Sequence, residues 1–524
     1  MASSSITEKN PARQSSSLGS TEGASISEVE TRLPATPIDA HEHDAEKGSK
    51  NTAYEVPEVS DLTEPEQVDW AGPDDPEKPV NWPRAKKWRI TLTVSMLTFL
   101  TPFASSMFAP AIGQVMKEMG TTNRDLGSFA VSIYLLGYAF GPLFIGPCSE
   151  LYGRLVVYHT CSVLFLLTNI GCALATNMPM LITFRVLTGV MGASPLTVGP
   201  GTVADLFQRE ERGRAMAIWT MPILIGPCIG PAVGAYLGRA EGWRWDFWLL
   251  IIMAGAFFMV SVITLRETHP PTLLRWKAKK LREAGNTIQP SSELDEPPLH
   301  LIITSVIRPL KMLFTSPIIF GLSLLTAVNY GVLYLLFTSV TEVFETRYGI
   351  VNNVGLVYFG IGAGQIAGIA VFGFVSDAMV RKLAKGGEMK PEHRLPPMIP
   401  GALMVPMGLL IYGWAAQYRV HWFVPIIGNF FIGVGVITVF APVSTYIVDA
   451  FTAYAASATA ANTVFRSMGG ALLPLAGPRM YAALDQGWGN TLLAGVSILM
   501  MSMIWVVMKY GEQLRTHPKY QLKL

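Results

Sequence analysis

The sequence predicts an all-α polytopic membrane protein with twelve transmembrane helices in two pseudo-symmetric six-helix bundles. Three observations support this fold class: the composition, the number of long apolar segments, and a motif repeated in the two halves. Of the 524 residues, 50% are hydrophobic and only 15% are charged, whereas soluble domains carry about 25% charged residues. This composition argues against a soluble cytosolic fold.

Long segments without Asp, Glu, Lys or Arg begin after residue 89, and each is long enough to cross a hydrocarbon core of about 30 Å as a helix of roughly 20 residues. Two further segments contain one arginine each. The segments without charge are 90–116, 126–149, 155–177, 215–238, 247–265, 312–341, 348–376, 395–418, 420–448 and 486–508, and those with one arginine are 178–204 and 450–478.

The remaining sequence divides into tails and one long linker. Residues 1–84 are rich in Ser, Thr, Glu and Pro, which predicts a disordered cytoplasmic N-terminal tail. We expect a first bundle at 85–265, a cytoplasmic linker at 266–311, a second bundle at 312–509 and a cytoplasmic C-terminal tail at 510–524. An even number of spans places both termini on one side. That side has 25 Lys and Arg residues and the opposite side has seven, so both termini are predicted to be cytoplasmic.

Within the linker, residues 272–283 predict a short amphipathic helix. Leu274, Ala278 and Leu281 share one face, and basic residues occupy the rest. Such a helix can lie on the anionic inner leaflet of the membrane. The alternative is an ordinary solvated linker helix.

A repeated motif supports two related bundles. The second span ends in Gly146-Pro-Cys-Ser-Glu150-Leu-Tyr-Gly-Arg154, and the eighth ends in Gly373-Phe-Val-Ser-Asp377-Ala-Met-Val-Arg381. In each copy an acid and an arginine lie four residues apart, so they can pair locally. They can also bridge neighbouring helices and latch the outward-facing state. The alternative is a pair of solvated surface charges.

These motifs resemble those of the major facilitator superfamily. The Gly146 to Arg154 stretch resembles its loop signature, although Leu155 replaces a second basic residue that members often have. Span four resembles its intramembrane arginine motif, with Leu181, Arg185 and Gly189 at spacings of four. The glycines and prolines of span five resemble the motif of drug:proton antiporters; they are Gly226, Pro227, Gly230, Pro231 and Gly234.

Three further stretches resemble the fungal twelve-span drug:proton antiporters. They are Asn81-Trp-Pro-Arg84, Glu267-Thr-His-Pro-Pro with the ten residues after it, and Tyr446-Ile-Val-Asp-Ala450 running on to Ala460-Ala-Asn-Thr-Val-Phe-Arg466-Ser467. The resemblance extends from about residue 81 to residue 511. It implies the major facilitator fold, proton-coupled export of drugs or toxins, and a part for Arg185 in proton coupling.

The glycines of span five share one helix face because they recur every four residues, and the two prolines bend the helix. We expect this face to form a tight, water-free interface along which the two halves rock.

Charged residues within the spans are candidates for function, because an arginine in the bilayer costs roughly 2.5–3.5 kcal/mol on insertion scales. Arg185 is such a residue, although it could also extend to the nearby outer interface. Arg466 lies about mid-span and is expected to face a central cavity or a buried hydrogen-bond partner. No span carries a central carboxylate. Asp205 is therefore the first candidate for the titrating group, and Glu342 the second.

The substrate cavity is predicted near the midplane between the two halves. Aromatic side chains with a few polar groups suit bulky amphipathic organic molecules. The lining candidates are Tyr134, Tyr138, Trp219, Asn329, Tyr330, Tyr334, Tyr358, Gln365, Asn429, Phe440 and Arg466.

The sequence therefore favours a monomeric, proton-coupled exporter in the fungal plasma membrane that moves drugs, toxins or secondary metabolites. A polyamine or nutrient carrier of the same fold is the alternative, and a membrane-embedded enzyme or receptor is a weaker one. The four cysteines and eight histidines have no metal-ligand spacing, and no ATP-binding loop is present. We expect no cofactor or metal. The net charge of +2 gives no support for a nucleic-acid partner.

Overall fold

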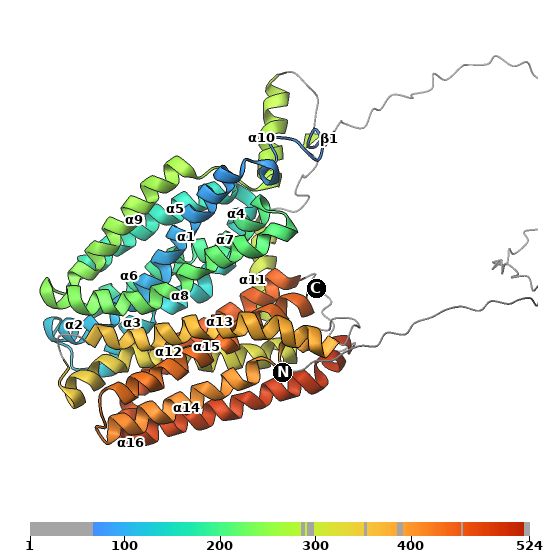
Figure 1. Cartoon of the computed structure of the whole chain (residues 1–524). Helices are drawn as coiled ribbons and strands as arrows, with labels where there is room; N and C mark the ends of the chain where they lie inside the picture. The colour runs from blue at the N-terminus through green and yellow to red at the C-terminus, as the bar shows by residue number, and fades with distance from the viewer. Residues whose placement is uncertain are drawn as a thin grey trace, which may run out of the picture. The chain divides into compact units, whose positions relative to one another are not determined.

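The helices of a computed structural model begin and end close to the predicted apolar segments (Figure 1). The structure describes residues 67–284, 289–290, 298–350, 354–384, 391–451 and 454–517. Most of the tail predicted at 1–84 lies outside these residues, as does the end of the chain after residue 517. The described residues all belong to the compact unit Thr63–Leu524.

The first group of helices runs from α1 to α9, and local sequence explains several of its boundaries. The side chain of Asn123 caps α3 by accepting from the backbone N–H groups of Asp125 and Leu126. Gly153 separates α4 from α5 with a φ of 95°, which glycine adopts without strain. The helices are α1 (Arg84–Met107), α2 (Ile112–Glu118), α3 (Arg124–Ser132), α4 (Tyr134–Tyr152), α5 (Arg154–Ala173), α6 (Met178–Gly192), α7 (Ser194–Leu206), α8 (Arg209–Ala240) and α9 (Arg244–Thr264).

The second group runs from α12 to α16, and α10 and α11 join it to the first. Short 3-10 helices lie at η1 (Pro79–Asn81), η2 (Ala109–Ala111), η3 (Val354–Val357) and η4 (Pro391–Arg394), and β1 (Gln67–Val68) pairs in parallel with β2 (Gln289–Pro290). The helices are α10 (Pro270–Glu283), α11 (Pro298–Thr315), α12 (Pro317–Tyr348), α13 (Tyr358–Ala384), α14 (Met398–Gln417), α15 (Phe423–Ala450) and α16 (Ala455–Thr516).

Helix α16 is two helices that meet at Asp485. This residue has φ 54° and ψ −176°, outside the helical region. The chain reverses direction there, which brings the Tyr481 hydroxyl within 3.3 Å of Asn490 Oδ1. Eleven described segments are long and apolar enough to cross a membrane, and the reversal makes the last of them two crossings. The prediction of an all-helical, polytopic fold is confirmed.

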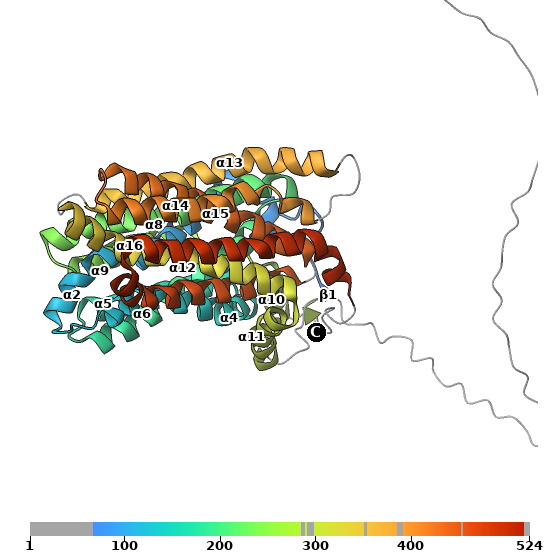
Figure 2. The ribbon, with the colours of Figure 1, turned by 90° about the horizontal axis from the view of Figure 1, so that it is seen from below.

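The two groups lie side by side, and each is held mainly by its own helix contacts (Figures 1 and 2). In the first, α1 packs along α8, and α5 along α6 and α9. In the second, α12 packs along α16, and α15 along α13 and α14. The groups meet where α16 contacts α3 and α4 and where α13 contacts α8. We call one end of the bundle the α10 end and the opposite end the α2 end, after the helices that Figure 1 shows there.

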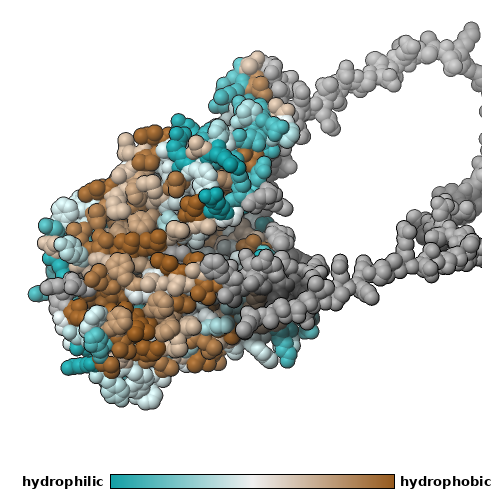
Figure 3. Space-filling view, viewed as in Figure 1, coloured by the Kyte–Doolittle hydropathy of each residue, from teal (hydrophilic) through white to brown (hydrophobic). Residues whose placement is uncertain are grey.

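The sides of the helices form an apolar surface. Figure 3 shows hydrophobic residues spread over the long helices and hydrophilic ones gathered around α10. Large exposed apolar side chains such as Ile252, Ile263 and Leu499 contribute to this surface. In water they would destabilise the protein, whereas lipid solvates them.

The predicted linker helix forms as α10, and its apolar face has a partner within the chain. Leu274 and Ala278 are buried in a small cluster with Trp70 and Leu281. On the polar side, Lys277 pairs with Asp75 at 3.4 Å. The backbone N–H groups of Ala71 and Glu77 and the nearby Lys277 hold the pKa of Asp75 below its usual value. Leu274 and Ala278 of α10 therefore pack against Trp70 in the segment before α1.

Candidate functional site

Arg185 is the largest of the fully buried side chains among the described residues, with 1% of its surface exposed. Its guanidinium donates to the carbonyl oxygens of Ala104 at 2.9 Å, Ser105 at 3.2 Å, Ala130 at 3.3 Å and Val131 at 3.1 Å. These carbonyls belong to the last turns of α1 and α3. Helix ends leave carbonyls without intrahelical donors, so Arg185 satisfies two helix ends at once.

Two aromatic rings flank the same guanidinium. Its carbon lies 5.3 Å from the centre of the Phe108 ring and 4.8 Å from that of Tyr134. Cation–π contacts contribute about 0.5–1 kcal/mol at exposed sites and about 2 kcal/mol or more when desolvated, as they are here. The expectation that Arg185 could extend to the interface is wrong, because carbonyls from two other helices hold it in the interior.

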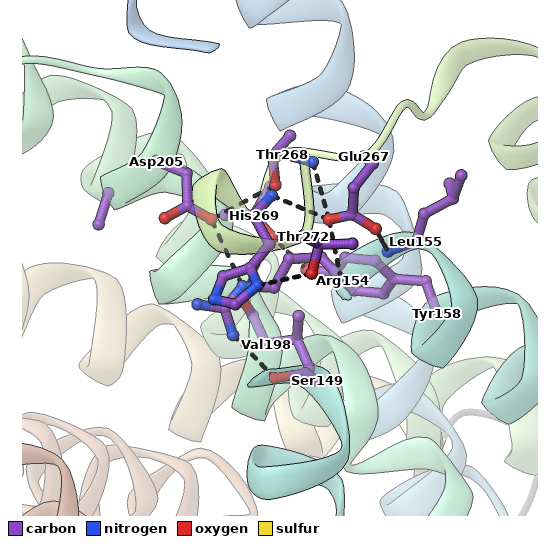
Figure 4. Close-up of polar contacts among 12 residues, drawn as sticks. Ser149, Arg154, Leu155, Tyr158, Val198, Asp205, Glu267, Thr268, His269 and Thr272 are labelled. Carbon is purple, nitrogen blue, oxygen red and sulfur yellow. Dashed lines mark hydrogen bonds and ion pairs between the residues drawn. The ribbon is translucent and has the colours of Figure 1, made fainter. Parts of the chain in front are cut away.

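A second polar cluster lies at the α10 end and is drawn in Figure 4. Arg154, at the start of α5, donates to Ser149 Oγ at 2.8 Å and pairs with Asp205 at 3.4 Å. Asp205 comes from the end of α7 and also accepts from the Thr268 hydroxyl at 3.4 Å. The side chains of Arg154 and Asp205 are each only 14% exposed. The ion pair therefore connects α5 with α7 away from bulk water, and the Thr268 hydrogen bond joins the segment after α9 to them.

Glu267 organises the same cluster from the chain between α9 and α10. It is buried and accepts from the backbone N–H groups of Arg154 and Leu155, both at 3.0 Å. These are the first N–H groups of α5, where a negative charge is stabilised by the helix dipole. Its Oε1 also accepts from the N–H groups of Thr268 and His269. A Cβ at Gly153 would collide with Glu267 Oε2, so only glycine leaves room for this cap.

His269 is held neutral beside this cluster. Burial and the positive charges of Arg154 and Arg275 lower its pKa to about 4. Its Nδ1 contacts the Thr272 hydroxyl at 2.9 Å, so the ring supplies a hydrogen bond to the first turn of α10 without adding a charge.

The predicted latch differs from the observed pairing. Glu150 is exposed on the last turn of α4, and Arg154 pairs with Asp205 rather than with Glu150. The local pairing at a spacing of four is therefore wrong for this half, because the glycine between α4 and α5 interrupts the helix. In the other half Asp377 and Arg381 belong to α13, but their side chains lie outside the described part of the structure.

Ion pairs join the two groups of helices at the α2 end. Arg124 of α3 pairs with Glu342 of α12 at 2.7 Å, and Asp125 of α3 pairs with Arg479 of α16 at 2.6 Å. Arg239 of α8 also pairs with a carboxylate of α12, that of Glu345. Glu342, a predicted titrating group, is thus half-exposed in an ion pair. A cavity of about 220 Å³ beside it is lined by residues of α3, α12 and α16.

A charge swap tests whether the Arg124–Glu342 pair stabilises this closed end. We expect Arg124→Glu to lower transport by about fivefold or less, because exposed ion pairs contribute about 0.2–1 kcal/mol. The double variant Arg124→Glu with Glu342→Arg should restore most of the rate, measured as initial transport in low and high salt. Equal rates in the single and double variants would show that the pair has no such role.

The glycines of α8 face α1, within the same helix group. A Cβ at Gly226 would lie 2.8 Å from Pro102, one at Gly230 would lie 2.8 Å from the Phe103 carbonyl, and one at Gly234 would overlap the Met107 carbonyl. The expectation that this face lies between the two halves is therefore wrong. Pro227 and Pro231 lie in the same stretch of α8. Instead, Cys228 and Ala232 approach Gly362 of α13 and Gly355 of η3 in the other group.

Gly234→Ala is expected to disrupt the α1–α8 contact. An added methyl group in a packed interior costs about 1–3 kcal/mol or more, and no side chain can move to relieve a clash with a backbone carbonyl. The variant should show reduced surface expression and a lower unfolding temperature. Gly213→Ala on the same helix is the matched control, since a Cβ there meets nothing within 4 Å. Similar losses in both variants would contradict the packing argument.

Most of the predicted cavity residues pack against other side chains in this conformation. Tyr334 contacts the Ser105 hydroxyl at 2.8 Å across the boundary between the groups. Trp219 donates to Thr98 at 3.0 Å within the first group. Tyr134, Tyr138, Trp219, Asn329, Tyr334, Tyr358, Gln365 and Asn429 are buried, whereas Tyr330, Phe440 and Arg466 are partly exposed.

The family profile of the Major Facilitator Superfamily matches residues 94–474. The chain belongs to this superfamily. It is 49% identical to the MFS-type transporter penM of Penicillium rubens, over 96% of this chain and 97% of that protein. It is 44% identical to the efflux pump radE of Floropilus chiversii, over 94% of each chain. These matches confirm the resemblance to fungal efflux transporters.

Solved structures of the superfamily share the fold. A D-xylose-proton symporter aligns with a TM-score of 0.63 at 17% identity, covering 80% of this chain and 97% of the symporter. A bacterial homologue of the lysosomal transporter Spinster aligns with a TM-score of 0.57 at 13% identity, covering 83% of this chain and 100% of the homologue. The match to the superfamily profile and the 49% identity to an MFS-type transporter show that this protein is a membrane transporter and not an enzyme. Within the described residues, no group of three or more His, Cys, Asp or Glu side chains could hold a metal ion.

Sequence reasoning missed the part played by Glu267. The residue opens one of the stretches that resemble fungal antiporters, but that stretch follows span six, whereas the helix it caps begins span three. Only two sequence features taken together could have indicated this role. The glycine at the end of span two leaves the next helix without an N-cap side chain, so an acid from another part of the chain is needed to cap it.

Proposed function

We propose that this transporter is a proton-coupled exporter of small amphipathic organic molecules, such as drugs, toxins or secondary metabolites. Its bundles at 85–265 and 312–509 would alternate access across the fungal plasma membrane, with one monomer as the working unit. The observation that supports export most directly is the 44% identity, over 94% of each chain, to a protein named an efflux pump.

The two ends of the bundle support alternating access. Ion pairs between the groups hold the α2 end together, whereas the Arg154 cluster at the α10 end lies within one group and its linker. With both termini in the cytoplasm, the α2 end faces outward and is closed in this conformation. Opening it requires the three ion pairs to break.

Asp205 is the proposed site of proton binding. Its carboxylate is largely shielded and is paired with Arg154, so protonation removes the charge that holds this arginine. Protonation also weakens the hydrogen bond from the Thr268 hydroxyl. Protons arriving here would loosen the α10 end. Arg185 would support coupling by positioning α1, α3 and α6. Glu342 is the second candidate, because its pair lies on the opposite side of the membrane.

Efflux from cells that lack their own exporters tests the proposal. A panel of hydrophobic drugs and fungal metabolites would be loaded, and efflux measured with the proton gradient intact and then collapsed. We expect gradient-dependent efflux that falls about tenfold or more in Asp205→Asn. Asp74→Asn, an exposed acid before α1, is the control and should retain the wild-type rate. Uptake instead of efflux would favour a nutrient or polyamine carrier, and efflux unaffected by loss of the gradient would rule out proton coupling.

A further inference from the structure

Arg466 occupies an unusual position in the second group of helices. It lies in the first arm of α16, and its guanidinium carbon is 4.6 Å from the ring centres of both Tyr330 of α12 and Phe440 of α15. The side chain is partly exposed. Its Nε is buried without a hydrogen-bond partner, and no carboxylate or carbonyl in the described part of the chain pairs with this guanidinium.

Comparison with Arg185 makes this position informative. Both arginines lie inside membrane-spanning segments. Arg185 donates four hydrogen bonds to carbonyls, whereas the contacts found for Arg466 are with ring faces. An arginine within the bilayer is costly unless it is paired, and ring faces compensate only part of that cost. The hydrogen-bond donors of Arg466 are therefore available to an anion that the chain itself does not supply.

The surroundings of Arg466 lie at the boundary between the two groups. One turn along α16, a Cβ at Gly470 would lie 2.7 Å from Leu135 of α4 and 2.8 Å from the Tyr330 ring. The Tyr330 ring packs in turn against the Tyr334 ring in a tilted arrangement, with the ring centres 5.0 Å apart. A molecule beside Arg466 thus contacts aromatic side chains near helices of both groups, which is where a carrier must hold its substrate to expose it to each side in turn.

We propose that Arg466 binds the acidic group of the substrate while Tyr330 and Phe440 contact its apolar body. The transported class is then amphipathic organic acids, with a carboxylate or an acidic enol. A guanidinium forms two parallel hydrogen bonds to such a group, and the two rings hold its plane in place. This inference rests on the proposed export function, and it names the class of substrate for the same transporter.

Binding of matched acids and esters tests the inference without any gradient. Full-length protein in nanodiscs of neutral lipid would be titrated at neutral pH with radiolabelled biphenyl-4-carboxylate and its methyl ester, followed by further aromatic acid and ester pairs. The wild type should prefer the acids by about tenfold or more, equivalent to about 1.4 kcal/mol. Arg466→Gln should reduce this preference to about twofold or less while still binding the esters, and Arg466→Lys should retain part of it.

Arg419→Gln is the matched control, because Arg419 is exposed in the turn between α14 and α15; it should keep the wild-type preference. Ester binding by Arg466→Gln shows that this variant is folded. A wild type that binds no acid of the panel, or no acid better than its ester, would overturn the proposal, as would an unchanged preference in Arg466→Gln. Acid-selective binding without gradient-driven efflux would support the acid-binding site at Arg466 and contradict the proposed export function. Gradient-driven efflux of neutral compounds alone would support the export function and contradict the acid-binding site.

Discussion

Replacing Arg185 by alanine is expected to reduce transport by about tenfold or more and to lower the unfolding temperature. The variant leaves four carbonyl oxygens of α1 and α3 without donors in a dry interior. Each unsatisfied buried acceptor costs about 1–3 kcal/mol, and a void remains between the rings of Phe108 and Tyr134. Initial transport rates and thermal unfolding of purified protein would be measured together.

Leu187→Ala is the control for this variant, since Leu187 lies on the same helix with 40% of its surface exposed. We expect it to behave like the wild type. Arg185→Lys should recover some stability, because an ammonium can reach some of the carbonyls, but it cannot donate in the same planar pattern. Near-normal transport by Arg185→Ala would show that the helix ends do not depend on this guanidinium.

Glu267→Ala should produce the second large effect. The substitution removes the acceptor for the first two N–H groups of α5 and for those of Thr268 and His269. Hydrogen bonds to a charged acceptor contribute about 1.5–3 kcal/mol each, and losing an N-cap alone costs about 0.5–2 kcal/mol. It also releases the start of α5, from which Arg154 reaches Asp205. We expect transport to fall about tenfold or more.

Two comparisons make the Glu267 result specific. Glu283→Ala removes an exposed acid in an ion pair with Lys279 and should leave transport unchanged. Glu267→Gln retains one acceptor oxygen, so it should lie between alanine and the wild type in unfolding temperature. If the glutamine and alanine variants both matched the wild type, the cap would have no part in holding the α10 end together.

The sequence predicted the fold well because membrane insertion depends on local properties. Hydropathy and segment length marked the helices, and loop charges predicted an orientation, which stays a prediction. The sequence also marked Arg185 as a candidate for function, since a charge within a span is costly wherever it points. It did not reveal what the arginine binds, because the carbonyls are 54–81 residues away along the chain.

The glycines of α8, Gly226, Gly230 and Gly234, also separate what the sequence could predict from what it could not. Its spacing correctly indicated a close helix contact, and the contact exists, because a methyl group added at Gly226, Gly230 or Gly234 would press into α1. The predicted partner of this face was wrong, since a stripe of small residues fits any helix that presents a smooth surface. The packing of the folded helices placed α1, rather than a helix of the other group, against this glycine face.

The sequence by itself determined that this protein is helical, that it crosses the membrane many times, and which residues are costly to bury. These properties depend on the free energy of transferring each segment from water to lipid, which is a sum over neighbouring residues. Only the tertiary structure decided that Arg185 binds carbonyls and that Arg154 pairs with Asp205 under the cap of Glu267. It also decided that Arg466 lies over the rings of Tyr330 and Phe440, with no acid paired to it among the residues that the structure describes. These pairings depend on distances between segments far apart in the chain, and local hydropathy carries no information about them.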